Sequence, residues 1–375
     1  MKKHIYICSL ICSSSALLLV FSNSKAQTKW TYDGVAVSGL STSETIPHAV
    51  GDGSGGVIIV WQDNRNNSND IYAQRLDING TQVWANSGVP ICTASGSQEA
   101  PQVTTDQNGG AIFVWRDRRV DSDGDIYIQR VGADGTAIWQ TNGIPICTTI
   151  HYQGEPRIIS DGFGGAIIVW QDRRNADSGN GSDLYAQRVD GSGNALWAAD
   201  GVSVISVPGD QDLPVLVGDG DGGVYVAWRH KDFALDNSDV YAQHLNSSGE
   251  KLWEDFGKIV ASGSAFQEDV DIALLSDGKC VLVWRDGTDP NVDIIAEVLD
   301  KDGNRYWSNK VIRDGLGENP KVATDSLGFI YITYEDYKTS NDGIYAQKLR
   351  MDGQEEWTVA VTQLQVLVRL KNLES

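Results

Sequence analysis

The twelve tryptophans of this 375-residue chain fall on two series of regularly spaced positions. The first series is Trp61, Trp115, Trp170, Trp228 and Trp284, continued by Tyr334. The second series is Trp30, Trp84, Trp139, Trp197, Trp253, Trp307 and Trp357. Members of the first series lie 50 to 58 residues apart, which indicates six copies of one repeat.

Each repeat reads as four short strands. A β-branched run leads to an Asp-x-x-Gly turn, where glycine supplies the positive φ of a tight hairpin. An unbroken apolar strand follows, as at Ala111 to Trp115, and then a polar loop. The third strand is Asp-Ile-Tyr-x-Gln-Arg, as at Asp125 to Arg130, and a second glycine turn leads to the second tryptophan.

This pattern predicts an all-β fold, a six-bladed β-propeller of four-stranded antiparallel blades. A strand that is apolar on both faces must be buried on both faces, and sheets stacked around an axis achieve this. The repeats start near residues 47, 101, 156, 214, 270 and 320, so the propeller is expected over residues 27–360. No segment has a sustained helical period, and almost no helix is expected.

The chain ends carry a signature of ring closure. The run from Trp30 to Gly34 matches the run from Trp197 to Gly201, the closing quarter of a repeat. Residues 27–46 are therefore predicted to complete the sixth blade beside Gly343 to Lys348. An incomplete seventh blade is the alternative. Residues 361–375 do not match the repeat and form an atypical C-terminal tail.

Residues 1–26 have the pattern of a secretory signal peptide. A basic start precedes an apolar run from Ile5 to Phe21, and Ser24-Lys25-Ala26 is a small-x-small cleavage pattern. A retained N-terminal anchor is the alternative. No other stretch approaches the length of a membrane span, so a protein exported to the cell surface, the medium or the periplasm is expected.

The net charge of the chain limits the classes of molecule that it is expected to bind. The signal segment contains three lysines and no acidic residue, so its removal takes the formal net charge from −20 to −23. Nucleic acids and anionic membranes select basic surfaces, and neither is expected as a partner.

The repeat resembles that of secreted bacterial β-propeller proteins. The resemblance is carried by the Asp-x-x-Gly-Gly turn, by Trp-Gln-Asp-x-Arg at Trp61 to Arg65, and by Asp-Ile-Tyr-Ala-Gln-Arg at Asp70 to Arg75. It implies the propeller fold and says little about activity, since propellers host many functions. The glycine turns are also remotely similar to the Asp-box turns of sialidases, although the order Ser-x-Asp-x-Gly-x-x-Trp is absent.

The long loops after the second strand are where a site is expected, because variable loops on a rigid scaffold usually carry function. The candidate ligand-binding residues there are Arg65, Arg119, Arg174, His151, Tyr152 and His230. The three arginines would suit an anionic sugar. The alternative is structural, with an aspartate that caps the turn and pairs with the arginine. His230 stands where the other five repeats have Asp63, Asp117, Asp172, Asp286 and Asp336.

An acidic residue precedes the first strand of every repeat. These residues are Glu44, Glu99, Glu155, Asp212, Glu268 and Glu318. Two alternatives stay open, namely pairing within each blade and an electronegative ring that holds a cation. Because repeats four to six lack the loop arginine, a calcium ion is expected toward Asp212, Glu268 and Glu318.

The mature chain keeps Cys92, Cys147 and Cys280, too few for a disulfide framework. Buried thiols are expected, with a bridge between Cys92 and Cys147 as the alternative. The expected function is that of a secreted, non-catalytic and monomeric module for binding or surface display, whose partner is a glycan or an extracellular protein. The alternative is a glycan-acting hydrolase, sialidase-like, with its site on the same loop face.

Overall fold

The computed structural model describes residues 34–179, 181–232, 235, 237–288, 291–337 and 343–357. These residues form β-strands and one turn of 3-10 helix, η1 (Ala176–Ser178). None of them forms a helix with the length and apolar character that crossing a membrane requires. The all-β class predicted from the repeat is confirmed.

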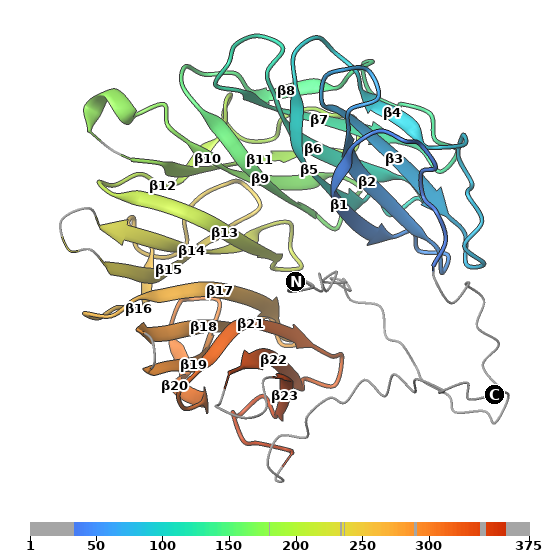
Figure 1. Ribbon diagram of the computed structural model, residues 1–375. Helices are drawn as coiled ribbons and strands as arrows, with labels where there is room; N and C mark the ends of the chain where they lie inside the picture. Colours follow the sequence, from blue (N-terminus) through green and yellow to red (C-terminus); the bar gives the residue numbers. More distant parts are fainter. Residues whose placement is uncertain are drawn as a thin grey trace, which may run out of the picture. The chain divides into compact units, whose positions relative to one another are not determined.

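Each repeat forms one antiparallel sheet with its strands side by side in chain order, and we number the sheets as blades one to six (Figure 1). Blades one and two comprise β1 (Glu44–Gly51), β2 (Val57–Asp63), β3 (Asp70–Leu76), β4 (Val89–Cys92), β5 (Gln98–Thr105), β6 (Ala111–Asp117), β7 (Asp125–Val131) and β8 (Ile144–Cys147). Blades three and four comprise β9 (Gln153–Ser160), β10 (Ala166–Asp172), β11 (Asp183–Val189), β12 (Val202–Ile205), β13 (Asp210–Gly218), β14 (Val224–Asp232), β15 (Asn237–Leu245) and β16 (Lys258–Ala261). Blades five and six comprise β17 (Gln267–Leu274), β18 (Cys280–Thr288), β19 (Asn291–Leu299), β20 (Arg305–Arg313), β21 (Gly317–Thr324), β22 (Ile330–Asp336) and β23 (Gly343–Leu349).

The Asp-x-x-Gly turns build the hairpins at one end of each blade. In blade two, Asp106 Oδ1 accepts backbone hydrogen bonds from Asn108 and Gly110, each at 2.8 Å. Gly109 between them has a φ of 82°, which residues with a Cβ rarely adopt. The carboxylate therefore caps the turn.

The second strand of a blade is buried on both faces, as its sequence predicts. In β6, the five residues from Ala111 to Trp115 are fully buried. Phe113 and Trp115 face the apolar layer shared with blade one, whereas Ile112 and Val114 face the layer shared with blade three. This alternation requires a sheet on either side of blade two.

The chain divides into two compact units, one of Met1–Asp236 with Tyr241–Lys258 and one of Asn237–Val240 with Ile259–Ser375. In the first unit, apolar layers lie between blades one and two, two and three, and three and four. In the second unit, a layer lies between blades five and six. Four-stranded sheets stacked across such layers are the packing of propeller blades.

The first described residues lie against blade one as an outer strand would. Gln82 Nε2 donates hydrogen bonds to the carbonyl oxygens of residues 36 and 37, at 2.9 and 3.2 Å. Arg305 Nη2 makes the same two contacts, both at 2.9 Å, with residues 259 and 260 of outer strand β16. Residues 34–38 therefore take the place of the outer strand that would precede blade one.

Several predictions about the chain ends fall on residues outside the described part. The signal segment 1–26, Trp30 and the tail 361–375 lie there. In the described part of blade six, β22 is the one named strand that pairs with β23. Closure of the ring by residues 27–46 stays a prediction.

Every first strand carries a β-bulge at its start. The bulge residues are Ile46, Ala100, Glu155, Leu213, Asp269 and Asn319, whose φ angles lie between 48° and 53°. The strand register shifts at each of these places. A bulge re-aims the neighbouring side chains, so it decides which residues of different blades are equivalent.

Candidate functional site

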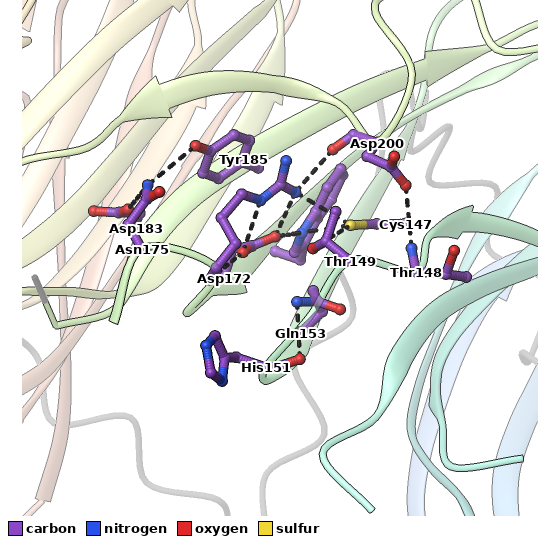
Figure 2. Close-up of polar contacts among 12 residues, drawn as sticks. Cys147, Thr148, Thr149, His151, Gln153, Asp172, Asn175, Asp183, Tyr185 and Asp200 are labelled. Carbon is purple, nitrogen blue, oxygen red and sulfur yellow. Dashed lines mark hydrogen bonds and ion pairs between the residues drawn. The ribbon is translucent and has the colours of Figure 1, made fainter. Parts of the chain in front are cut away.

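One polar cluster recurs at the loop end of blades one to three, and Figure 2 shows the blade-three copy. Trp170 Nε1 donates a hydrogen bond of 2.8 Å to Asp172 Oδ2. Arg174 donates to both oxygens of the same carboxylate, from Nε at 2.9 Å and from Nη2 at 2.6 Å. This carboxylate is fully buried, so the guanidinium balances its charge and the indole N–H adds a further hydrogen bond.

The same guanidinium has three further contacts. Arg174 Nη2 donates to the carbonyl oxygen of Asp200 at 2.9 Å and to Cys147 Sγ at 3.1 Å. Its carbon lies 3.7 Å from the centre of the Tyr185 ring, a cation–π contact. Arg65 and Arg119 repeat this arrangement over Tyr72 and Tyr127.

The three arginines therefore act within their own blades. Their side chains are only 17 to 19% exposed, and their bidentate partners are Asp63, Asp117 and Asp172. This is the structural alternative considered for them. They lie in successive blades and are not gathered into one anion site.

A second aspartate lies opposite the first in each of these blades. The register pairs Asp63 with Asp70, Asp117 with Asp125, and Asp172 with Asp183. Burial raises the pKa of Asp70 and Asp183, although each accepts an amide hydrogen bond, from Asn66 at 2.6 Å and Asn175 at 2.8 Å.

The blade-two copy of this aspartate is the most perturbed. Burial, followed by the charges of Asp121 and Asp117, raises the pKa of Asp125 to about 6. Val120 stands where blades one and three have the donating asparagine, and Asp125 Oδ2 is buried without a hydrogen-bond partner. Such a carboxyl could transfer a proton near neutral pH, but it is fully buried in the blade.

His151 and Tyr152 lie beside the blade-three cluster rather than in it. The Nε2 atom of His151 lies 3.2 Å from Oδ2 of the exposed Asp177. Tyr152 lies between two guanidiniums, with its ring centre 5.3 Å from Arg116 and 5.8 Å from Arg173. The contacts described for these two residues therefore do not involve Arg65, Arg119 or Arg174.

The bulges separate the six acidic residues into three positions. Four of them are equivalent, because Glu99, Asp212, Glu268 and Glu318 face Arg116, Arg229, Arg285 and Glu335 across the first two strands. Glu44 faces Asp63 instead, one position earlier, and Glu155 is itself the bulge residue. The expected single ring of six carboxylates therefore reduces to four equivalent residues.

The carboxylates of blades four to six were expected to lack arginine partners, and the structure differs from this expectation. Asp212 accepts hydrogen bonds from Arg229 at 2.8 and 2.7 Å, and Arg285 Nη1 lies 3.5 Å from Glu268. Arg285 Nη2 lies 3.9 Å from Glu318. The described residues contain no group of three metal-ligating side chains. Calcium binding toward these carboxylates stays a prediction, and arginines already oppose the charges on which it relies.

Blade four departs from the cluster. His230 replaces the aspartate and Asp232 replaces the arginine, while Trp228 and Tyr241 keep their places and stack with ring centres 6.0 Å apart. The corresponding rings of blade two are 6.4 Å apart. Trp228 is fully buried, and its indole nitrogen has no hydrogen-bond partner.

A pocket of about 340 Å³ opens at this point of the first unit. Its walls are Ile205, Val207, Pro208, Trp228, His230, Asp232, Tyr241 and Phe256. Phe256 stands where blades one to three have Ser87, Asn142 and Asp200, whose carbonyl oxygens bind the arginines. Loss of the guanidinium and of this polar turn therefore coincides with a cavity.

His230 is held on one side. Gln211 Nε2 lies 3.2 Å from His230 Nδ1 and also donates to the carbonyl oxygens of Val207 and Gly209, both at 3.1 Å. This contact engages Nδ1, one of the two ring nitrogens that can carry a proton. Gln211 Oε1 is buried without a partner. A half-turn of the amide would present that oxygen to a protonated Nδ1.

The sequence pointed to one residue of this pocket and missed the others. His230 was a candidate because it breaks the aspartate series, whereas Asp232 and Phe256 stand at positions that vary between the repeats. The approach of Ile205 from blade three depends on the packing of neighbouring sheets, which the repeat alone does not fix.

All three described cysteines are free and buried, so the disulfide alternative for Cys92 and Cys147 is wrong. Each of these two thiols lies against the aspartate of the next blade, at 3.7 Å from Asp117 and 3.8 Å from Asp172. They are packing residues of the cluster.

No protein-family model and no curated protein matches this chain. Among solved structures, a polysaccharide lyase described as an ulvan lyase matches at a TM-score of 0.50 with 13% identity, over 82% of each chain. An α-L-arabinanase of Penicillium chrysogenum matches at 0.46 with 11% identity, over 82% of this chain and 93% of its own. A Hadza microbial sialidase matches at 0.45 with 14% identity, over 78% and 63%.

At these identities the likeness shows the propeller fold alone. It nevertheless corrects the expectation of a non-catalytic module, because the solved structure with the TM-score of 0.50 is a polysaccharide-cleaving enzyme. The resemblance to secreted bacterial propellers is confirmed for the fold and gains no support from a sequence family.

Proposed function

We propose that this chain is a glycan-cleaving enzyme whose site is the blade-four pocket. The observation that carries the proposal is the break in the repeat. Where blades one to three bury an aspartate–arginine pair, blade four has a cavity walled by a histidine, an aspartate and three aromatic rings. Pockets with apolar walls and a few convergent polar groups are the usual form of small-molecule sites.

The wall chemistry suits a sugar. Aromatic rings pack against the C–H faces of sugar rings, and Phe256 at 67% exposure offers such a face to solvent. Hydroxyl groups both donate and accept hydrogen bonds. They therefore match a set that contains the Asp232 carboxylate and His230.

The two titratable groups have complementary roles in hydrolysis. Protonated His230 donates its Nε2 proton to the leaving glycosidic oxygen as the bond to the anomeric carbon breaks. Water forms the new bond to that carbon, and Asp232 accepts the proton that this water loses. Protons and bonds balance, and exchange with solvent restores both side chains.

The expected setting follows from the N-terminal segment. Residues 1–26 carry the signal-peptide pattern, so the substrate is expected to be a polysaccharide or surface glycan outside the cytoplasm. The strong negative charge of the chain favours neutral or cationic glycans over anionic ones.

The test is a cleavage assay on arabinan, ulvan, sialylated glycans and glucosamine polymers. New reducing ends report hydrolysis, and ultraviolet absorbance of an unsaturated product reports elimination. His230→Asn and Asp232→Asn should each lower kcat by at least about 100-fold, the usual contribution of one proton-transfer group.

His151→Asn is the matched control, because this histidine also lies in a loop of the first unit and its ring lies against the exposed Asp177. It should retain kcat within about twofold, since it touches no wall of the pocket. Circular dichroism of all variants checks the fold. Full activity in both folded pocket variants would overturn the proposal.

A further inference from the structure

The first strands of the blades share one position whose residue type changes from blade to blade. In the first unit the strand register pairs this position with the residue just before the first-series tryptophan. The residues at this position are His48, Gln102, Arg157 and Val215. Their strands β1, β5, β9 and β13 lie side by side in this order (Figure 1). Three polar side chains therefore stand on three neighbouring strands.

His48 and Gln102 form a hydrogen bond between two blades. Gln102 Nε2 lies 3.1 Å from His48 Nε2, and this is the one hydrogen bond of the imidazole ring found among the described residues. With the amide nitrogen at this place, Gln102 donates and His48 Nε2 accepts, so the ring carries its proton on Nδ1. Burial, followed by the charge of Arg157, lowers the pKa of His48. The imidazole is therefore neutral at pH 7 and has an N–H group to donate.

Arg157 is a half-buried guanidinium without an acidic partner. Among the described residues, every other arginine forms an ion pair except Arg173, which is exposed. Arg157 Nη1 donates to the carbonyl oxygen of Pro156 at 3.1 Å. Burial lowers the pKa of Arg157, and the charge of the exposed Glu155 opposes this. A half-buried cation without a carboxylate costs stability, and such a cost is typical of binding sites.

In the second unit the charges at the same position offset each other. Asp271 and Lys321 stand there in blades five and six. Burial raises the pKa of Asp271, and the charge of Lys321 opposes this. Asp271 Oδ2 also accepts a hydrogen bond of 3.0 Å from the backbone N–H of Val322. The second unit therefore has one acid and one base at this position, whereas the first unit has a base and no acid.

We infer that Arg157, His48 and Gln102 form a binding site for a small organic carboxylate. The planar guanidinium has parallel N–H groups that match the two oxygens of a carboxylate. The His48 Nδ1–H group adds a third donor, and Gln102 holds the ring from its other side. The inference does not rest on the proposed function, because none of these residues lines the blade-four pocket.

The charge and the next strand narrow the ligand further. The site has one cation, which favours a singly charged ion over phosphate, and the negative chain repels polyanions. Val215 stands at the same position of the strand after that of Arg157, so the apolar part of an organic acid has an apolar neighbour there. A monomeric sugar acid combines one carboxylate with such a carbon skeleton.

The probe is sodium glucuronate, compared with glucose and with inorganic phosphate by isothermal titration calorimetry at constant ionic strength. Glucuronate should bind at least about tenfold more tightly than glucose, the difference expected for one charge-assisted bidentate contact. Phosphate should bind more weakly than glucuronate. Equal binding of glucuronate and glucose, or phosphate binding as tight as that of glucuronate, would overturn the carboxylate site.

Substitutions of Arg157 test the site directly. Arg157→Met keeps the length of the side chain and removes the charge, so it should weaken glucuronate binding at least about tenfold. Arg157→Lys keeps the charge and loses the fork, and it should weaken binding at least about threefold. Arg173→Met is the matched control, because it removes an exposed arginine that also forms no ion pair among the described residues. It should change the affinity less than about twofold.

The ligand-free protein gives a second readout. Because Arg157→Met removes a half-buried cation that has no carboxylate partner, it should raise the melting temperature by about 1 to 3 °C. A fall in melting temperature would show that the fold itself uses the guanidinium and would overturn the inference. Unchanged glucuronate binding in the folded Arg157→Met variant would place the ligand elsewhere and would overturn it as well.

Discussion

Blades two and four put the same tryptophan in opposite surroundings. Trp115 donates to Asp117, whose charge is balanced by Arg119, and the space around them is filled. Trp228 has no partner for its indole nitrogen, and a pocket of about 340 Å³ lies beside it. Three copies of the repeat use these positions for stability. The fourth copy lacks the aspartate–arginine pair and its stabilisation. Such departures from a stable arrangement are typical of functional sites.

The largest expected effect is on stability in blade two. Asp117→Ala leaves the guanidinium of Arg119 in a largely buried place without its carboxylate and removes the acceptor of Trp115. Breaking a buried pair in this way should lower the free energy of unfolding by about 3 kcal/mol. Chemical denaturation measures the loss.

His230→Ala in blade four is the matched substitution, because the indole nitrogen of Trp228 has no hydrogen-bond partner and so does not depend on His230 in the way that Trp115 depends on Asp117. We expect a loss of about 1 kcal/mol or less. Equal losses in the two variants would show that the blade-four position is as structural as its counterpart.

The reverse experiment restores the repeat. His230→Asp with Asp232→Arg should give Trp228 an acceptor and fill the cavity, and we expect a gain of about 1 to 2 kcal/mol in unfolding free energy. Thermal and chemical unfolding both report it. A destabilised double variant would mean that the longer strand β14 aims residue 232 differently from the arginines it replaces.

Most of the fold could be predicted from the sequence because the same pattern of strands and turns occurs six times. The doubly apolar run at Ala111 to Trp115 requires sheets on both faces, and the Asp-x-x-Gly turns fix the hairpins. It was harder to predict which residues of different blades occupy equivalent positions. A bulge at each first strand shifts the register, and so Glu44 and Glu155 were aligned with residues that face elsewhere.

The site was only partly predictable. A residue that departs from the repeat, such as His230, can be seen in an alignment of the repeats. A pocket forms only where the surrounding side chains leave space unfilled, and this depends on all of them. The arginines illustrate the converse. Their pattern suits an anion site, yet each guanidinium donates to an aspartate two residues earlier, a contact that the loop geometry decides.

A pH-dependent comparison concerns the aspartates opposite the cluster. Since the folded pKa of Asp125, about 6, exceeds the usual unfolded value, the folded state holds the proton more tightly. Stability from this group is complete at low pH and is lost as the pH rises from about 4 to 6, with no further change above.

Asp125→Asn should therefore gain about 1 to 2 kcal/mol over the natural protein at pH 7 and nothing near pH 4. Unfolding at a series of pH values measures the difference. Asp70→Asn is the control, because Asn66 already donates to that carboxylate. A gain for Asp125→Asn that does not change with pH would contradict the raised pKa.

The smallest effect concerns the thiol that links blade two to the blade-three cluster. Cys147 is fully buried, and its sulfur accepts a hydrogen bond of 3.1 Å from Arg174 Nη2. Cys147→Ala removes that weak acceptor and leaves a void of one sulfur atom, whereas Arg174 keeps both oxygens of Asp172 and the carbonyl of Asp200. We expect a loss of about 1 kcal/mol or less, measured by chemical denaturation under reducing conditions. A loss near that of Asp117→Ala would mean that the cluster depends on the neighbouring blade. The Asp200 carbonyl in the same blade would then not be the main support of Arg174. By the same reasoning, Ile205, which stands at the position of Cys147, would be the residue that keeps the blade-four pocket open.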